Sequence, residues 1–161
     1  MNDDSSLILR GGCQCGAVRY EARGQPYHRT VCHCTTCRRT SGAPMVGWFS
    51  VAAAGFRFTQ GQPRRFRSSA QALRSFCGDC GTPLTYEYGE KHIGLTIGAL
   101  DRPADVRLSE QLASPARVPY FEDLAKLPVH RTDEPRAAAH LAGIVSYQHP
   151  DHDTGAWPPG R

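Results

Sequence analysis

Lysine, long apolar runs and long basic runs are all scarce in this chain. Of its 161 residues, 19 are lysine or arginine, but only Lys91 and Lys126 are lysines. No apolar run approaches the roughly 20 residues that a membrane-spanning helix needs, so we expect no membrane partner. The net charge is +4 and the pI is 8.8, yet the long basic runs of nucleic-acid-binding tails are missing. This charge pattern argues against nucleic acid as the partner and leaves a small anionic molecule open.

The N-terminal stretch, MNDDSSLILRGGC, also lacks the basic and apolar segments of a signal peptide. We therefore expect a cytoplasmic protein, in which thiols stay reduced. The chain nevertheless holds seven cysteines. In a reducing compartment, such cysteines indicate metal binding or catalysis before disulfide bonds.

Helical patterns are weak over most of the chain. Apolar residues instead alternate with polar ones in short runs that Gly or Pro separates, which predicts an all-β domain. The expected strands cover residues 17–22, 45–51, 55–61, 64–69, 72–77, 84–89 and 92–100. One short helix is expected at 137–148, followed by an irregular, Pro- and Gly-rich end. The late histidines His130, His140, His149 and His152 have scattered spacing, which favours a solvated tail.

Two cysteine pairs far apart in the sequence complement each other. Cys77 and Cys80 form a C-x-x-C turn, and Gly81 permits the tight backbone of a zinc knuckle. Cys13 and Cys15 form a C-x-C pair, whose side chains share one face if the segment is extended. Together the two pairs predict a closed, structural zinc site with four cysteine ligands. The alternatives are four buried thiols, or a redox C-x-x-C beside an unrelated C-x-C.

The three remaining cysteines lie close together in the stretch CHCTTC. Extended backbone places Cys32 and Cys34 on one face, and Cys37 completes the arc, while His33 faces away. Three protein ligands with one open position are typical of catalytic zinc. The alternative is a second structural site with a fourth ligand from elsewhere; the candidates are His28, His92 and Asp79.

The stretches GGCQCGAVRYEA, CHCTTCRRTSGAP and FCGDCGTPLTY, with the later HIGLTIGALDRP, resemble one protein family. This is the glutathione-dependent formaldehyde-activating enzyme family, which also includes centromere protein V. The resemblance covers residues 9–128 and leaves residues 129–161 as a partly irregular C-terminal extension. It implies an all-β fold of the β-tent (Mss4-like) type, with antiparallel sheets held by zinc and a short C-terminal tail in which a helix can form.

The resemblance also implies the roles of the cysteines. Two zinc ions per chain are expected. Cys13, Cys15, Cys77 and Cys80 match the structural zinc ligands of the family, and Cys32, Cys34 and Cys37 match its catalytic zinc ligands. One departure is visible at residues 114–128, where relatives often carry a tryptophan. Tyr120 and Phe121 are the residues that can replace it in packing.

The chemistry that follows is thiol activation. Zinc with three thiolates accepts a substrate thiol as a thiolate, the nucleophilic form, which can attack a nearby aldehyde. With glutathione and formaldehyde the product is S-hydroxymethylglutathione, so the class is carbon–sulfur lyase. Arg38 and Arg39 are candidates for binding a carboxylate of the thiol, and Ser41 for lining the pocket with a hydroxyl. Ordinary surface charges and a simple turn are the alternatives for these residues.

Two other function classes stay open. The first is a non-catalytic zinc-binding module for nucleic acid or a protein partner, although no aromatic platform with basic residues between is visible. The second is a purely structural zinc protein. The sequence gives no indication of the oligomeric state.

Overall fold

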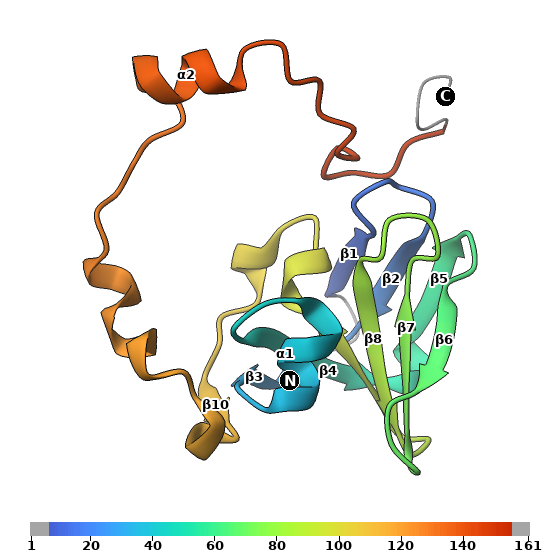
Figure 1. Ribbon diagram of the computed structural model, residues 1–161. Coiled ribbons are helices and arrows are strands. Elements are labelled where there is room, and N and C mark those ends of the chain that lie inside the picture. The colour runs from blue at the N-terminus through green and yellow to red at the C-terminus, as the bar shows by residue number, and fades with distance from the viewer. Residues whose placement is uncertain (1–6, 156–161) are drawn as a thin grey trace.

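The computed structural model describes residues 7–155, which form two β-sheets (Figure 1). A three-stranded antiparallel sheet has the order β1-β2-β5, and a seven-stranded sheet has the order β10-β3-β4-β9-β8-β7-β6. The smaller sheet consists of β1 (Ile8–Gly12), β2 (Arg19–Arg23) and β5 (Phe56–Gln60). The larger sheet consists of β3 (Tyr27–Cys32), β4 (Val46–Ala52), β6 (Arg64–Arg67), β7 (Ala72–Phe76), β8 (Pro83–Tyr88), β9 (His92–Thr96) and β10 (Glu110–Leu112). The expectation of an all-β fold is confirmed.

Strand pairing is antiparallel except at one edge of the larger sheet. There, β10 runs parallel to β3, with Glu110 opposite Thr30 and Leu112 opposite Cys32. A parallel neighbour needs a long connection, and the chain between β3 and β10 contains most of the domain. The pairing therefore anchors the end of the domain beside the cysteine cluster that starts at Cys32.

The core lies between the two sheets. Tyr20 and Ala22 of β2 meet Phe49 of β4 and Leu95 of β9, and all four side chains are fully buried. Alternation along β4 places Phe49 in this core and sends Trp48 to the opposite face of the sheet. The larger sheet thus has one face on the core and a second face free to build a site.

Most expected strands are present with shifted ends, but three strands were not expected. Residues 92–100 form a strand only to Thr96, and Ile97–Ala99 is a short 3₁₀ turn. The missed strands are β1, β3 and β10, which do not show clean alternation in sequence. In β3, exposure falls steadily along the strand instead of alternating, and His28 adopts a positive φ of 46° at an irregularity.

The helices differ from the sequence expectation. The helix α1 (Thr35–Ser41) was not expected, because Cys37 is its one buried residue and no apolar period marks it. Cys34 caps its start: the backbone N–H of Cys37 donates to Cys34 Sγ at 3.3 Å. The expected helix at 137–148 was misplaced, since α2 (Pro135–Leu141) starts at a proline and ends earlier. The end of the domain also includes the 3₁₀ helix η5 (Pro119–Lys126). No helix among residues 7–155 has the length and apolar character that crossing a membrane requires.

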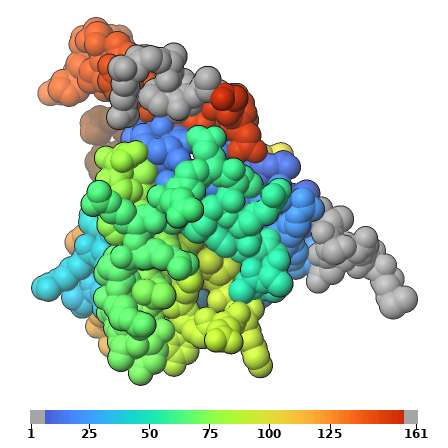
Figure 2. Space-filling view, turned by 90° about the vertical axis from the view of Figure 1, so that its right-hand side faces the viewer, coloured from blue at the N-terminus to red at the C-terminus, as the bar shows by residue number. Residues whose placement is uncertain are grey.

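The C-terminal segment makes a wide arc through η5 and α2 and returns beside β1 (Figure 1). Figure 2 shows its last described part, in red, against the blue N-terminal strands. The backbone N–H of His149 donates to the carbonyl of Gln14 at 2.8 Å, and His149 is 2% exposed. The expectation of a solvated tail is therefore wrong for His149, although His130, His140 and His152 are exposed. Burial here comes from a long-range contact that local spacing does not encode.

Candidate functional site

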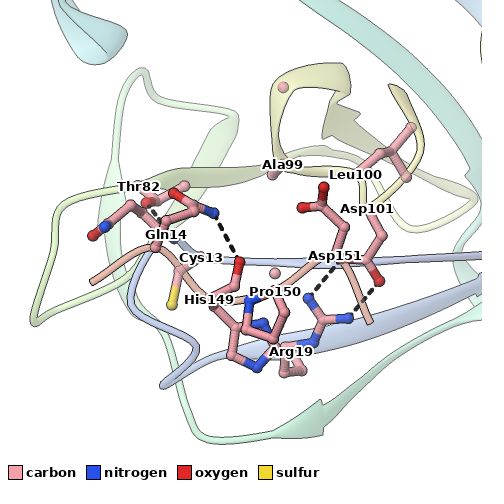
Figure 3. A pocket seen from close by; sticks show the side chains of 13 residues that line it. Cys13, Gln14, Arg19, Thr82, Ala99, Leu100, Asp101, His149, Pro150 and Asp151 are labelled. Atoms are coloured by element: carbon pink, nitrogen blue, oxygen red, sulfur yellow. Dashed lines mark hydrogen bonds and ion pairs between the residues drawn. The ribbon is translucent and has the colours of Figure 1, made fainter. Parts of the chain in front are cut away.

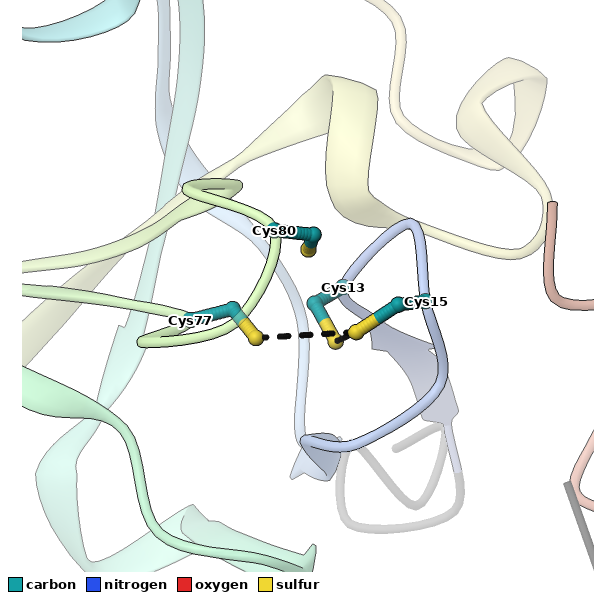
Figure 4. Close-up of side chains that lie close together, drawn as sticks. All are labelled: Cys13, Cys15, Cys77 and Cys80. Carbon is teal, nitrogen blue, oxygen red and sulfur yellow. Dashed lines mark hydrogen bonds between the residues drawn. The ribbon is translucent and has the colours of Figure 1, made fainter. Parts of the chain in front are cut away.

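Four cysteine sulfurs from two distant turns meet in one cluster (Figure 4). Cys13 and Cys15 lie between β1 and β2, and Cys77 and Cys80 lie between β7 and β8, with all four Sγ atoms within 4.8 Å of one another. Tetrahedral zinc with Zn–S bonds of 2.3 Å would separate sulfurs by about 3.8 Å. The Cys13–Cys15 and Cys15–Cys77 sulfur distances are 3.6 Å and 3.8 Å. The cluster therefore fits a closed tetrahedral metal site, and all four thiols are free.

Both turns are shaped by backbone hydrogen bonds. The expectation that Cys13 and Cys15 lie in extended backbone is wrong, because the pair sits in a turn that Gly16 closes by donating to the Cys13 carbonyl at 3.0 Å. In the second turn, Gly81 at φ 79° donates to the Cys77 carbonyl at 3.0 Å. A left-handed residue closes each turn, which is why glycine stands there.

The thiols of this cluster differ in acidity. Burial raises the pKa of Cys13 above its usual range. Burial also works against ionisation of Cys80, but its hydrogen bonds with Thr82 lower the pKa to about 6. Thr82 additionally accepts from the backbone N–H of Gln14 at 3.0 Å, so it joins the two turns. A metal ion must displace the protons that burial favours on Cys13 and Cys15.

The second cluster contains Cys32, Cys34 and Cys37, whose sulfurs also lie within 4.8 Å of one another. Cys32 ends β3, Cys34 caps α1 and Cys37 lies within the helix. His33 points away from the sulfurs, as expected: it is fully buried, its Nε2 is 3.1 Å from Gln111 Oε1, and its ring meets Phe121 edge-on. Phe121, considered in the sequence as a replacement for a tryptophan, thus packs behind this cluster.

A fourth protein ligand does not join the three sulfurs. Within residues 7–155, the group of ligand atoms within 4.8 Å of one another consists of these three cysteines alone. His28 and His92 line the same cavity, and Asp79 is exposed on the turn of the other cluster. Three sulfurs without a fourth ligand leave room for a ligand from outside the protein.

The sulfurs of the second cluster form one wall of a cavity of about 400 Å³. The opposite face of β4 and the neighbouring strands supply the rest of the wall. Besides the three cysteines, its side chains include Trp48, Arg74, Tyr86, His28, His92 and Glu110. Burial raises the pKa of Cys32 to about 12. It also opposes ionisation of Cys34, but the backbone N–H of Cys37 lowers the pKa of that thiol.

Arg74 is a site residue that the sequence analysis missed. It stands on β7 opposite Tyr86 and is 7% exposed. Its guanidinium carbon lies 4.7 Å from the centre of the Tyr86 ring and 5.3 Å from that of Trp48. Its Nη2 donates to Cys37 Sγ at 3.3 Å. The one signal in the sequence that could indicate a buried arginine is its position: Arg74 shares a strand face with Ala72 and lies three residues before Cys77.

The residues expected to bind substrate are all on α1. The Ser41 hydroxyl donates to the Cys37 carbonyl at 2.8 Å and accepts from the N–H of Ala43. Arg39 is exposed, and Arg38 is half-buried. In the described part of the chain, none of Arg38, Arg39 and Ser41 is among the side chains that line the cavity. Their role in substrate binding stays a prediction.

A smaller hollow of about 110 Å³ lies beside the four-cysteine cluster (Figure 3). Arg19 is central to it and donates to Asp101 at 2.8 Å and to Asp153 at 2.9 Å. Gln14 and His149 form another part of the wall. The polar groups here hold the C-terminal segment in place, so the hollow belongs to the docking of that segment.

Fold and sites together define a β-sheet protein with two candidate metal centres, one closed by four cysteines and one open to a cavity. The sequence model of the glutathione-dependent formaldehyde-activating enzyme family matches residues 8–115, and the chain belongs to this family.

Two curated relatives support the assignment. A Schizosaccharomyces pombe protein named as an uncharacterized lyase is 32% identical over 78 residues, which are 48% of this chain and 56% of that protein. A Halomonas elongata protein, provisionally named a glutathione-dependent formaldehyde-activating enzyme, is 36% identical over 50 residues, which are 30% of each. The chain thus spans about half or less of the length of these relatives.

A solved structure supports the fold. The crystal structure of a Rhodobacter sphaeroides protein superposes with a TM-score of 0.52 at 21% identity. The match covers 63% of this chain and 98% of that one. At this identity the likeness concerns the fold alone, and it agrees with the β-tent expectation.

Proposed function

We propose that the protein is a zinc-dependent carbon–sulfur lyase that joins a small thiol such as glutathione to formaldehyde or a related small aldehyde. The observation that carries the proposal is the convergence of Cys32, Cys34 and Cys37 on the wall of a 400 Å³ cavity. Cavities of about 300–1,000 Å³ are typical of small-molecule sites. The family to which the chain belongs supports the choice of thiol and aldehyde.

Each cluster has its own role in this proposal. Cys13, Cys15, Cys77 and Cys80 hold a structural zinc that joins the two sheets, and Cys32, Cys34 and Cys37 hold a catalytic zinc. Zinc at the open site supplies the Lewis acidity that lowers the pKa of a bound thiol. Trp48 and Tyr86 provide apolar walls that exclude water from the reacting atoms.

The chain's own groups handle the proton. When the carbon–sulfur bond forms, the thiol loses a proton and the aldehyde oxygen gains one. His28 and His92 line the cavity, with their ring centres 6.3 Å apart, and an imidazole has one nitrogen that can accept a proton and one that can donate it. These two residues are the cavity's candidates for carrying the proton. On α1, Arg38 and Arg39 are kept as candidates for holding a substrate carboxylate, and Ser41 for lining the approach.

Metal analysis is the first test. Protein purified anaerobically and without chelator should contain two zinc ions per chain. Cys37→Ser should lower the content toward one. A single zinc in the unaltered protein would contradict the division of the cysteines into two sites.

Calorimetry with glutathione and S-methylglutathione tests thiol activation. A thiol that binds as thiolate releases a proton, so the measured enthalpy should depend on the buffer. S-methylglutathione keeps both carboxylates but cannot form a thiolate, and it should bind at least about tenfold more weakly, a difference of about 1.4 kcal/mol. Equal affinities would refute the mechanism and favour a non-catalytic zinc module.

A further inference from the structure

Arg74 is a buried cation without a carboxylate partner. It is 7% exposed, and no ion pair among residues 7–155 involves it. Its Nε is buried and has no hydrogen-bond partner in that part of the chain. Glu110 lines the same cavity but forms no ion pair with it. The hydrogen-bond acceptor that the structure gives to Arg74 is a sulfur, Cys37 Sγ at 3.3 Å.

Two arginines of the described residues differ from Arg74 in this respect. Arg65, on the neighbouring strand β6, is exposed and pairs with Glu87 at 2.6 Å. Buried Arg19 has two carboxylates, Asp101 and Asp153. A buried charge is stable only when it is paired, because removal from water is costly. The rings of Trp48 and Tyr86 attract the guanidinium, but they do not carry a negative charge.

The negative charge of a metal–thiolate centre at the open site would give Arg74 the anionic partner that the protein's carboxylates do not provide. Three thiolates on Zn²⁺ have a net charge of −1, and a substrate thiolate would make it −2. Each step adds negative charge in a partly buried place, where a nearby cation stabilises it more than in water. Arg74 donates to one of the three sulfurs, so its positive charge lies against this centre.

We propose that Arg74 is the counter-ion of the open metal site and that it makes the cavity select anionic thiolates over neutral ligands. Arg74 is thus a positioning residue: it acts through Cys37 and the bound thiolate and is held in place by Trp48 and Tyr86. The selectivity rests on the proposed thiol chemistry, whereas the pairing with the metal–thiolate centre does not.

Zinc retention tests the pairing without an activity assay. In chelator competition, Arg74→Gln should weaken zinc binding at the open site by about tenfold or more and leave the four-cysteine site unchanged. The closed site reports in the same molecule that the variant is folded. Arg74→Lys should recover part of the loss, because it restores the charge but not the flat guanidinium between the rings. Arg67→Gln, an exposed change on β6, is the matched control and should have no effect.

Ligand preference tests the selectivity on the zinc-loaded proteins. Glutathione and 2-mercaptoethanol should both bind about tenfold more weakly to Arg74→Gln, while neutral imidazole should bind as well as before or better. If the unaltered protein binds no thiol but Arg74→Gln loses zinc, the counter-ion role stands and the proposed function fails. If thiols bind, but Arg74→Gln keeps both its zinc and its thiolate preference, the inference is overturned and the proposed function stands.

Discussion

The loss of a single cysteine should have different effects on the protein in the two cysteine clusters. Cys77 is 1% exposed, and its cluster connects turns that are more than 60 residues apart in sequence, as the Cys15–Cys77 contact shows. The cluster of Cys32, Cys34 and Cys37 spans one strand end and one short helix. Loss of a ligand from the first cluster should therefore affect folding, and loss from the second should affect chemistry.

Cys80→Ser and Cys37→Ser separate these two effects. Cys80→Ser should lower the free energy of unfolding by several kcal/mol, because metal binding at a structural site contributes directly to folding. Cys37→Ser should leave the melting temperature close to that of the unaltered protein while it weakens zinc at the open site. Thermal melts with parallel zinc analysis measure both quantities. Equal losses of stability would show that the assignment of structural and catalytic roles is wrong.

The grouping of the cysteines was the feature of the candidate site that the sequence predicted best. Sulfur ligands follow from the identity of cysteine, so spacing alone was enough to group all seven, and the structure brings together the same two groups. Arg74 was not predictable, because its meaning depends on Trp48, Tyr86 and Cys37, which three other elements supply. The role of an arginine is a property of its surroundings.

At the scale of elements, glycines decide where the backbone segments can meet. Gly11 of β1 faces the 3₁₀ turn Ile97–Ala99, and a Cβ there would overlap the carbonyl oxygen of Ala99 and lie 2.5 Å from the Tyr20 hydroxyl. Gly42 ends α1 at φ 70°, but a Cβ there would meet nothing within 4 Å. Gly11 permits the close packing of two backbone segments, whereas Gly42 is needed only for its left-handed backbone conformation.

Gly11→Ala and Gly42→Ala should therefore differ in cost. Gly42→Ala should lower the free energy of unfolding by about 1 kcal/mol, the usual strain of a left-handed alanine. Gly11→Ala should cost roughly 3 kcal/mol or more, because both of its close neighbours belong to packed backbone or a buried ring. Urea denaturation of the two variants measures the difference. A Gly11→Ala loss no larger than that of Gly42→Ala would contradict the close approach.

Elements were predictable where one pattern determined them. Strands β4, β8 and β9 alternate or are continuously apolar, and they were found near their expected places. The helix α1 is set by its caps, Cys34 and Gly42, and not by an apolar face, so periodicity missed it. Strand β10 consists of three exposed residues, and it pairs with β3, which lies about 80 residues earlier in the sequence, so no local pattern marks it.

At the scale of the whole molecule, the two ends of the described chain lie together. The side chain of Arg19 is 4% exposed, and it pairs with Asp101, just after the 3₁₀ turn Ile97–Ala99, and with Asp153, in the C-terminal segment. His149 contacts Gln14, which stands between Cys13 and Cys15 of the four-cysteine cluster. The C-terminal segment thus supports the loop that carries two of the four clustered cysteines.

Asp153→Asn should loosen this contact. The substitution removes one of the two carboxylates of a buried arginine, and we expect a loss of about 1 kcal/mol together with faster zinc release from the closed site. Asp123→Asn, which disrupts an exposed pair with Lys126, is the control and should change stability by less than about 0.5 kcal/mol. Denaturation and chelator kinetics measure the two effects. Identical behaviour of the variants would refute the supporting role of the segment.

Acidification should also release the segment. Burial lowers the pKa of His149, and the positive charges of Arg19 and His152 act in the same direction against the attraction of Asp101. The unfolded form therefore binds a proton at a higher pH than the docked form, so docking loses stability as the pH falls below about 6.5. The protection factor of the amide of residue 149, which is the exchange rate corrected for its intrinsic dependence on pH, should fall between pH 7.5 and 5.5. In His149→Gln, this loss of protection should vanish; if it persists unchanged, His149 is not its source.

The two edge strands of the larger sheet are very different. On one side is β10, with only three residues, and on the other is β6, whose four residues are all exposed and include Arg64, Arg65 and Arg67. Among the described residues, β6 hydrogen-bonds to a strand on one side only. The unpaired backbone groups of an edge strand can pair with a strand of another chain. Natural proteins prevent this with short edge strands or with charged side chains on the edge. The arginines of β6, green in Figure 2, therefore oppose edge-to-edge aggregation, because their charges disfavour the pairing of this strand with a strand of a second molecule.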